Sequence, residues 1–152
     1  MDIMSYLLGK KSGGGGGNLS EYFVNSGYVE NAGACIKKIP FDIDLTGITN
    51  ASNFCYQWAN LESISIRNGG SVTNVHYMFM GCVKLKFIDV RDIVFSTITS
   101  SSNKSGFLGI SSNNRVPYDC LIIVKDEIEK QALLDYFVYW TNIKTVEEYE
   151  NE

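Results

Sequence analysis

Side chains that could carry out chemistry are sparse in this sequence. His76 is the single histidine among the 152 residues, and the sequence gives it no evident catalytic partner. A histidine without such a partner more often has a structural role than a catalytic one. The sequence also lacks a nucleophile-elbow motif, a phosphate-binding loop and an H-E-x-x-H motif. We therefore expect no catalytic residue and no cofactor, and we predict that the chain is not an enzyme.

The cysteines do not form a recognisable metal site. Their spacings contain no C-x-x-C pair, which argues against zinc. We expect buried free thiols that behave as small hydrophobic side chains, with disulfide pairing as the alternative. The four residues are Cys35, Cys55, Cys82 and Cys120.

Two pairs of carboxylates follow apolar segments, at Asp42/Asp44 and Asp89/Asp92. We expect them to lie at strand ends and to be solvated there, with a calcium site as the alternative. The acidic segment at residues 147–152 is expected to be solvated as well. The prediction is therefore a chain that holds no metal.

Composition predicts a folded and mildly acidic domain. Hydrophobic residues make up 45% and aromatic residues 12% of the sequence, which is enough to build a core. The 13 basic and 17 acidic residues give a net charge of -4, so there is no clustered basic footprint for nucleic acid. No apolar run approaches the length of a membrane span, so we expect no membrane insertion. The first residues do not have the pattern of a secretory signal peptide, and we expect none.

A glycine-rich joint separates the first residues from the rest. Gly13 to Gly17 are consecutive glycines, which have no side chains to pack and the most backbone entropy to lose. The short peptide before them has an apolar head and a basic end, which suits docking into another protein while the linker lets the body move. We predict that residues 1–18 are an attachment peptide and linker. Its partner-binding residues are Tyr6, Leu7, Leu8, Lys10 and Lys11.

Residues 19–124 contain an internal repeat. Residues 48–50 (ITN) align with residues 72–74 (VTN) at an offset of 24, which lies within the range of leucine-rich repeats. Each unit ends in the pattern L-x-x-I-x-[IV], in which alternate apolar side chains lie on one face of a strand. The same pattern begins upstream at Ile36, and a last apolar run covers residues 120–124. The strand positions predicted to be buried are Leu61, Ile64, Ile66, Leu85, Ile88 and Val90.

The segments between the strands are predicted to be short helical or looped segments, with a layer of short helices as the favoured interpretation. Val75, Met78, Phe79 and Cys82 have the i, i+3, i+4, i+7 spacing of one helical face. The segment from residue 98 to residue 114 is rich in Ser, Asn and Gly, and we interpret it as an enlarged repeat that has lost its helix. Because one unit cannot bury its own apolar face, we predict stacked units with parallel strands, which form an α/β solenoid.

Residues 125–152 are predicted to cap this solenoid. Asp126 followed by Glu129 resembles a capping box. We expect a helix from Glu127 to about Tyr139, and a further short strand at residues 143–146. The apolar stripe of the helix consists of Ile128, Ala132, Leu133, Tyr136, Phe137 and Trp140. Leu133, Phe137 and Trp140 are expected to cover the end of the core.

The two aligned units resemble those of BspA-type leucine-rich-repeat surface proteins. ITNASNFCYQWANLESISI and VTNVHYMFMGCVKLKFIDV are similar to the pattern V-T-N-M-S-x-M-F-x-G-C-x-S-L-x-S-L-D-L, with the best match from Val72 to Val90. The first unit departs from it, because Gln57-Trp58 replaces Gly-Cys, which predicts local repacking. The resemblance implies a leucine-rich-repeat fold and no particular ligand.

The two ends of the chain carry a second resemblance. YLLGKKSGGGGGNLSEYF is similar to N-termini shared by proteins of phages of gut bacteria, and CLIIVKDEIEKQALLDYFVYWTNIKTVEEYE resembles the cap that follows such repeats in those proteins. These resemblances imply a virion structural protein of fibre, decoration or adaptor type, assembled in the host cytoplasm. Its N-terminal peptide would bind other virion proteins, and its repeat domain would be displayed in several copies toward a host-surface glycan or protein. The alternative is a bacterial surface adhesin or a generic interaction module of the leucine-rich-repeat class.

Overall fold

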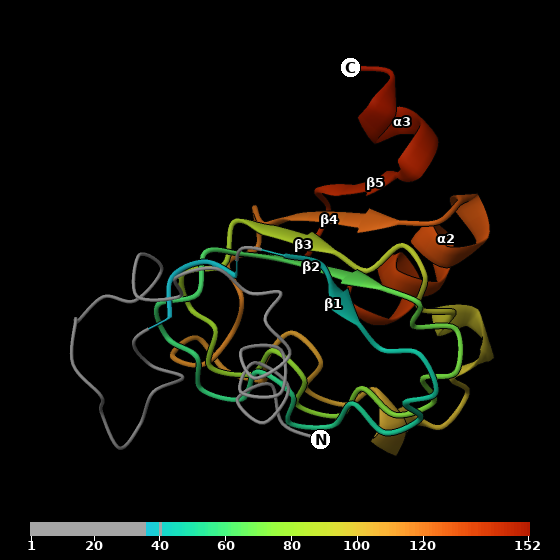
Figure 1. Cartoon of the computed structure of the whole chain (residues 1–152). Helices are drawn as coiled ribbons and strands as arrows, with labels where there is room; N and C mark the ends of the chain where they lie inside the picture. The colour runs from blue at the N-terminus through green and yellow to red at the C-terminus, as the bar shows by residue number, and fades with distance from the viewer. Residues whose placement is uncertain (1–35, 40) are drawn as a thin grey trace.

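A parallel sheet of five strands in chain order forms the centre of the protein (Figure 1). The computed structural model describes residues 36–39 and 41–152. The strands are β1 (Ile43–Asp44), β2 (Ser63–Arg67), β3 (Phe87–Asp89), β4 (Leu121–Val124) and β5 (Ile143–Thr145). The helix α2 (Glu127–Tyr136) follows β4 in the chain. The sheet and this helix confirm the predicted α/β class with parallel strands and a C-terminal helix. No helix in the described ranges is long and apolar enough to cross a membrane.

Strands β2 and β3 are paired in the register that the repeat predicted. The strand predicted from Ile36 to Phe41 is wrong in its bounds, because β1 begins at Ile43, which pairs with Ile66. Ile64 pairs with Ile88, and Ile88 pairs with Ile122, so a row of buried isoleucines crosses the sheet. Burial of a side chain of this size contributes about 1.5–3 kcal/mol. The predicted strand positions Leu61, Ile64, Ile66, Leu85, Ile88 and Val90 are all buried, which confirms that part of the prediction.

A layer of turns, and not a layer of helices, packs against this sheet. Val75, Met78, Phe79 and Cys82 are fully buried, but their segment forms consecutive turns. Its N–H groups alternate between two kinds of acceptor. Met78 N donates to Val75 O at 3.0 Å within the segment, whereas Phe79 N donates to Phe107 O at 3.0 Å in the next segment along the chain. The prediction of short helices is therefore wrong, because buried positions three and four residues apart also suit consecutive turns.

The same geometry occurs one period earlier. We call residues 50–58, 74–82 and 101–114 the first, second and third turn segments. Gln57 N of the first donates to Met80 O of the second at 2.7 Å. Gln57 has a φ of 61°, and Gly81, its equivalent 24 residues later, has a φ of 90°. The backbone at Gln57 therefore keeps the left-handed conformation of its equivalent Gly81, and the repacking predicted at Gln57-Trp58 does not change it.

The polar segment at residues 98–114 supplies the third turn segment. Asn103 O accepts a hydrogen bond from Val75 N at 2.7 Å, and Ser105 O accepts one from Tyr77 N at 3.1 Å. A short 3-10 helix, η3 (Phe95–Thr97), lies just before this segment, and a second one, η4 (Ser101–Asn103), lies within it. The enlarged repeat thus continues the turn layer.

Aromatic contacts join the third turn segment to the C-terminal cap. Phe107 is fully buried, and its ring centroid lies 5.4 Å from that of Phe79 and 5.6 Å from that of Phe137. Leu133, Phe137 and Trp140 are buried as predicted. These contacts place the cap on the last part of the core.

Two positions of the predicted helical stripe face solvent. Ile128 is 68% exposed, Tyr136 is 38% exposed, and the helix ends at Tyr136, before the predicted end. Glu129 is buried in their place and accepts hydrogen bonds from Ser96 N at 3.0 Å and Ser96 Oγ at 2.6 Å. Asp126 caps the helix by accepting from Glu129 N at 3.1 Å. Only half of the predicted capping box therefore forms, because the Glu129 side chain is bound to η3.

The segment predicted as a further strand forms β5, which pairs with β4. It leads directly into α3 (Val146–Glu150). A full capping box begins α3: Thr145 Oγ1 accepts from Glu148 N at 3.1 Å, and the Glu148 side chain accepts from Thr145 N at 2.8 Å. In Figure 1 this helix lies on the opposite side of the sheet from the turn layer.

Gly81→Ala tests the close approach of adjacent turn segments. A Cβ at Gly81 would lie 2.7 Å from the Cα of Gln57, and the residue has a left-handed φ of 90°. We expect the free energy of unfolding, measured by urea denaturation, to fall by about 2 kcal/mol or more. Gly70→Ala is the control, because a Cβ there meets nothing within 4 Å. Equal and small effects of the two substitutions would contradict the stacked turns.

Candidate functional site

The sheet has one face packed on the core and one face that carries polar side chains. On β2, Ile64 and Ile66 are buried in the core. Ser63, Ser65 and Arg67 alternate with them and are partly exposed on the opposite side. We call this opposite side the outer face, and it is the candidate site.

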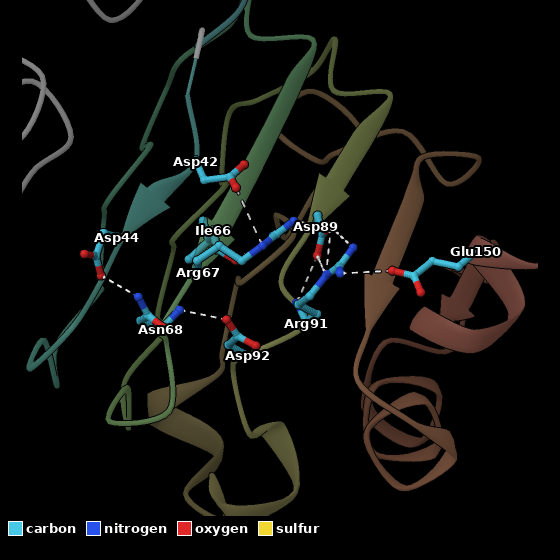
Figure 2. A network of polar contacts seen from close by, with 9 residues as sticks. All are labelled: Asp42, Asp44, Ile66, Arg67, Asn68, Asp89, Arg91, Asp92 and Glu150. Carbon is cyan, nitrogen blue, oxygen red and sulfur yellow. Dashed lines mark hydrogen bonds and ion pairs between the residues drawn. The ribbon is translucent and has the colours of Figure 1, made fainter. Parts of the chain in front are cut away.

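A buried carboxylate lies at the centre of the outer face. Asp89, at the end of β3, is only 2% exposed. Arg91 donates to it through Nε at 3.1 Å and Nη2 at 2.8 Å, and Nη2 of Arg67 lies 3.2 Å away (Figure 2). The backbone N–H of Arg91 also donates to it at 3.2 Å. Two guanidinium groups and an amide thus compensate the charge, which offsets the cost of burying it.

Two exposed acids extend this network at its margins. Asp42 Oδ2 lies 3.7 Å from Arg67 Nε, and Glu150 Oε1 lies 3.5 Å from Arg91 Nη1. Pairs this exposed contribute little in water. The hydrogen bonds to Asp89 raise the pKa of Arg91 above its ordinary value, so the guanidinium stays charged at every physiological pH.

Two of the other predicted strand-end carboxylates accept hydrogen bonds from residues of the loops that follow the strands. Asp44 accepts from Thr46 N at 3.0 Å and from Asn68 Nδ2 at 3.1 Å. Asp92 accepts from Asn68 N at 2.7 Å, so Asn68 links the loops that follow β1 and β3. Among the described residues, no group of three or more His, Cys, Asp or Glu side chains is arranged to hold a metal. The expectation that all four carboxylates are solvated is wrong at Asp89.

Helix α3 packs over part of the outer face. The ring centroid of Tyr149 lies 5.8 Å from that of Phe87, which alternates with the core residue Ile88 on β3. Ile123 is paired with Asp89, points to the same face and is fully buried. Because α3 also contacts β4, we assign the burial of Ile123 to this helix. The outer face is therefore covered near β4 and polar at β2.

Surface ion pairs connect α3 to neighbouring elements. Lys130 Nζ of α2 lies 2.9 Å from Glu148 Oε1, and Lys144 pairs with Glu152. The hydrogen bond from Thr145 N, and then the one from Lys130, lower the pKa of Glu148. The acidic segment is solvated as expected, because its glutamates are exposed, and Glu148, Glu150 and Glu152 also form ion pairs at the surface.

The described thiols are not poised to react. Cys55, Cys82 and Cys120 are free and buried, as expected, and Cys35 lies outside the described residues. Burial raises the pKa of Cys82 and of Cys120 to about 12, and it raises the pKa of Cys55 well above its ordinary value. Because the thiolate is the nucleophile, these groups are inert at neutral pH.

His76 is held by stacking on a neighbouring ring. Its ring centroid lies 3.7 Å from that of Tyr77, and its Nδ1 is buried without a hydrogen-bond partner in the described part of the chain. Among the described residues, no group therefore makes the hydrogen bond to Nδ1 that would orient a general base.

The outer-face network was not predicted, although the sequence contains a signal for it. Asp89 and Arg91 are two positions apart in an apolar strand pattern, which places them on one face. Arg67 stands one period of 24 residues before Arg91. The predicted attachment residues are a separate case, because Tyr6, Leu7, Leu8, Lys10 and Lys11 lie outside the described residues.

Comparison of the chain with protein-family models, with curated proteins and with solved structures finds no match.

Asp89→Ala tests the network at the outer face. The substitution leaves Arg67 and Arg91 facing each other without the carboxylate, so we expect a loss of about 2 kcal/mol in the free energy of unfolding. Asp42→Ala is the matched control and should cost less than about 0.5 kcal/mol, because its contact is long and exposed. Urea denaturation measures both, and a neutral Asp89→Ala would contradict the role assigned to this carboxylate.

Acid should loosen α3 before it unfolds the sheet. The pKa of Glu148 is lowered in the folded state, so its stabilising effect is present above the ordinary glutamate pKa of about 4.3 and is lost as the pH falls through the lowered value. We expect the NMR amide signals of α3 to move in this window while those of β2 and β3 do not. Glu148→Gln should already show the loosened signals at neutral pH. A single transition shared by helix and sheet would contradict this.

Proposed function

We propose that this chain is a short solenoid of the leucine-rich-repeat type, which serves as a non-enzymatic binding or structural module. One observation carries the proposal: residues 24 positions apart are neighbours in both layers. Ile64 pairs with Ile88 in the sheet, and Thr73 N donates to Thr49 O at 2.8 Å in the turns. Repeated units of this kind bury their core only by stacking on one another.

The outer face supports a role in binding a protein or a glycan. Its arginines are already paired with Asp89, so they do not form the free basic patch that nucleic acid requires. The hydroxyls of Ser63 and Ser65 lie beside this network on β2 and are partly exposed. Hydroxyls next to fixed charges can make directional hydrogen bonds to a neutral polar ligand.

We further propose that residues 1–18 attach this module to a larger assembly, in the way that the resemblance to phage structural proteins implies. Five consecutive glycines cannot transmit rigid packing, so the peptide before them gains little from packing on its own domain. Tyr6, Leu7 and Leu8 would be buried by a partner, and Lys10 and Lys11 would flank that contact. Several tethered copies on one virion would gain avidity for a host surface. A bacterial surface adhesin, or another interaction module of the same class, is the alternative.

Deletion of residues 1–17 tests this function. We expect an unchanged melting temperature together with loss of incorporation into phage particles, measured by complementation of particles that lack the protein. A double substitution of Leu7 and Leu8 by Asp should have the same effect, whereas Ser12→Ala in the linker should have none. Normal incorporation of the deleted chain would contradict the attachment role, and unfolding would show that the peptide belongs to the core.

A further inference from the structure

The loop before β4 and the loop after α2 together form an exposed aromatic surface. Tyr139 is 67% exposed and Tyr118 is 37% exposed, and their ring centroids lie 5.5 Å apart. The guanidinium carbon of Arg115 lies over the Tyr118 ring, 4.1 Å from its centroid. We call Arg115, Tyr118 and Tyr139 the tyrosine patch. Tyrosine and arginine side chains are the usual anchors of binding surfaces.

Buried neighbours hold the patch in one arrangement. Tyr118 makes an edge-to-face contact with Trp140, with a centroid distance of 4.8 Å and an interplanar angle of 81°. Trp140 is buried, and its Nε1 donates to Val116 O at 3.0 Å. Asn142 Nδ2 donates to Asp119 O at 3.0 Å, which ties the loop before β4 to the chain after α2. Side chains on a fixed support lose less entropy when a ligand binds.

Arg115 differs from the two arginines of the outer face in what it contacts. Arg67 and Arg91 bind the carboxylate of Asp89, whereas Arg115 lies over an aromatic ring. The ring attracts the cation through its quadrupole but carries no charge that would neutralise it. A partly exposed guanidinium in this position can bind a ligand carboxylate through two parallel N–H···O bonds. The patch therefore joins an anion-binding group to an exposed aromatic ring.

The backbone around the patch is engaged in bonds within the chain. Val116 N donates to Leu108 O at 2.8 Å, and Cys120 N donates to Pro117 O at 3.0 Å. The carbonyls of Val116 and Asp119 accept the two side-chain hydrogen bonds described above. Extended peptides commonly dock through main-chain hydrogen bonds at a sheet edge. The tyrosine patch instead favours a ligand that side chains recognise.

We infer that the tyrosine patch binds a sugar acid of a glycan, which is a pyranose ring that carries a carboxylate. The Arg115 guanidinium binds the sugar carboxylate, and the Tyr139 ring packs against the C–H groups of the sugar ring. Asp119 follows Tyr118 and is exposed. Its carboxylate can accept from sugar hydroxyls, whereas it would repel a run of acidic peptide side chains. This inference uses no residue of the outer face or of the attachment peptide.

NMR titration of the full chain with acidic and neutral oligosaccharides tests this inference. The probes are tetragalacturonate, with its methyl ester as the uncharged match, and sialyllactose, with lactose as the uncharged match. We expect at least one acidic probe to bind at least about tenfold more tightly than its neutral match. The signals of Arg115, Tyr118 and Tyr139 should shift during that titration.

Substitutions within the patch should weaken the binding while the melting temperature stays unchanged. Arg115→Gln should weaken it at least about tenfold, and Tyr139→Ala at least about threefold. Lys104→Gln is the matched control, because Lys104 Nζ also lies over a tyrosine ring, 4.7 Å from the centroid of Tyr136, outside the patch. We expect this control to bind as the unsubstituted chain does.

Several outcomes would overturn the inference. If neither acidic probe binds, the patch is not a sugar-acid site. Equal affinities of an acidic probe and its neutral match would show that the charge of Arg115 is not used. Tighter binding of tetraglutamate than of both acidic sugars would assign the patch to an acidic peptide. Signals that shift only at Ser65 and Arg67 would place the sugar on the outer face instead.

Discussion

Hydrogen bonds between successive turn segments are the constraint on which the rest of the structure depends. Every buried N–H needs an acceptor, and here the acceptors alternate between the same segment and the next one. Cys55 N donates to Met78 O, and Phe79 N donates to Phe107 O. A helix would have satisfied these groups locally, and the segments would then be free to separate. Because half of the bonds join neighbours, the segments are held in register, and Gly81 must accept the backbone of Gln57 at close range.

The register of the turns also determines what the sheet can present. Because β2 and β3 are paired one period apart, Arg67 lies beside Asp89. Arg91, which follows Asp89 at the end of β3, binds the same carboxylate. Both guanidinium groups and the backbone N–H of Arg91 offset the cost of burying this charge. Helix α3 then covers the neighbouring part of the outer face through Tyr149. The outer face is therefore bounded on one side by a helix and carries a charge network centred on Asp89.

Much of this architecture can be predicted from the sequence, because its causes are local or periodic. The offset of 24 and the alternation of apolar residues predict the parallel strands, and Leu133, Phe137 and Trp140 predict the cap. The turn layer could not be predicted, since the spacing of Val75, Met78, Phe79 and Cys82 suits a helix equally well and the choice depends on acceptors in the next segment. Glu129 was missed for a similar reason: its partner, Ser96, lies 33 residues away. Prediction of the outer-face network would have required the register between β2 and β3. The attachment peptide remains a prediction.

The most direct test of the account is NMR measurement of scalar couplings across hydrogen bonds in the turn layer. The structure predicts couplings from Cys55 N to the carbonyl carbon of Met78, and from Phe79 N to that of Phe107, because those pairs share hydrogen bonds of 2.8 Å and 3.0 Å. Couplings from Phe79 N to the carbonyl four residues earlier, as in an α-helix, would contradict the stacked turns and with them the proposal that this protein is a solenoid.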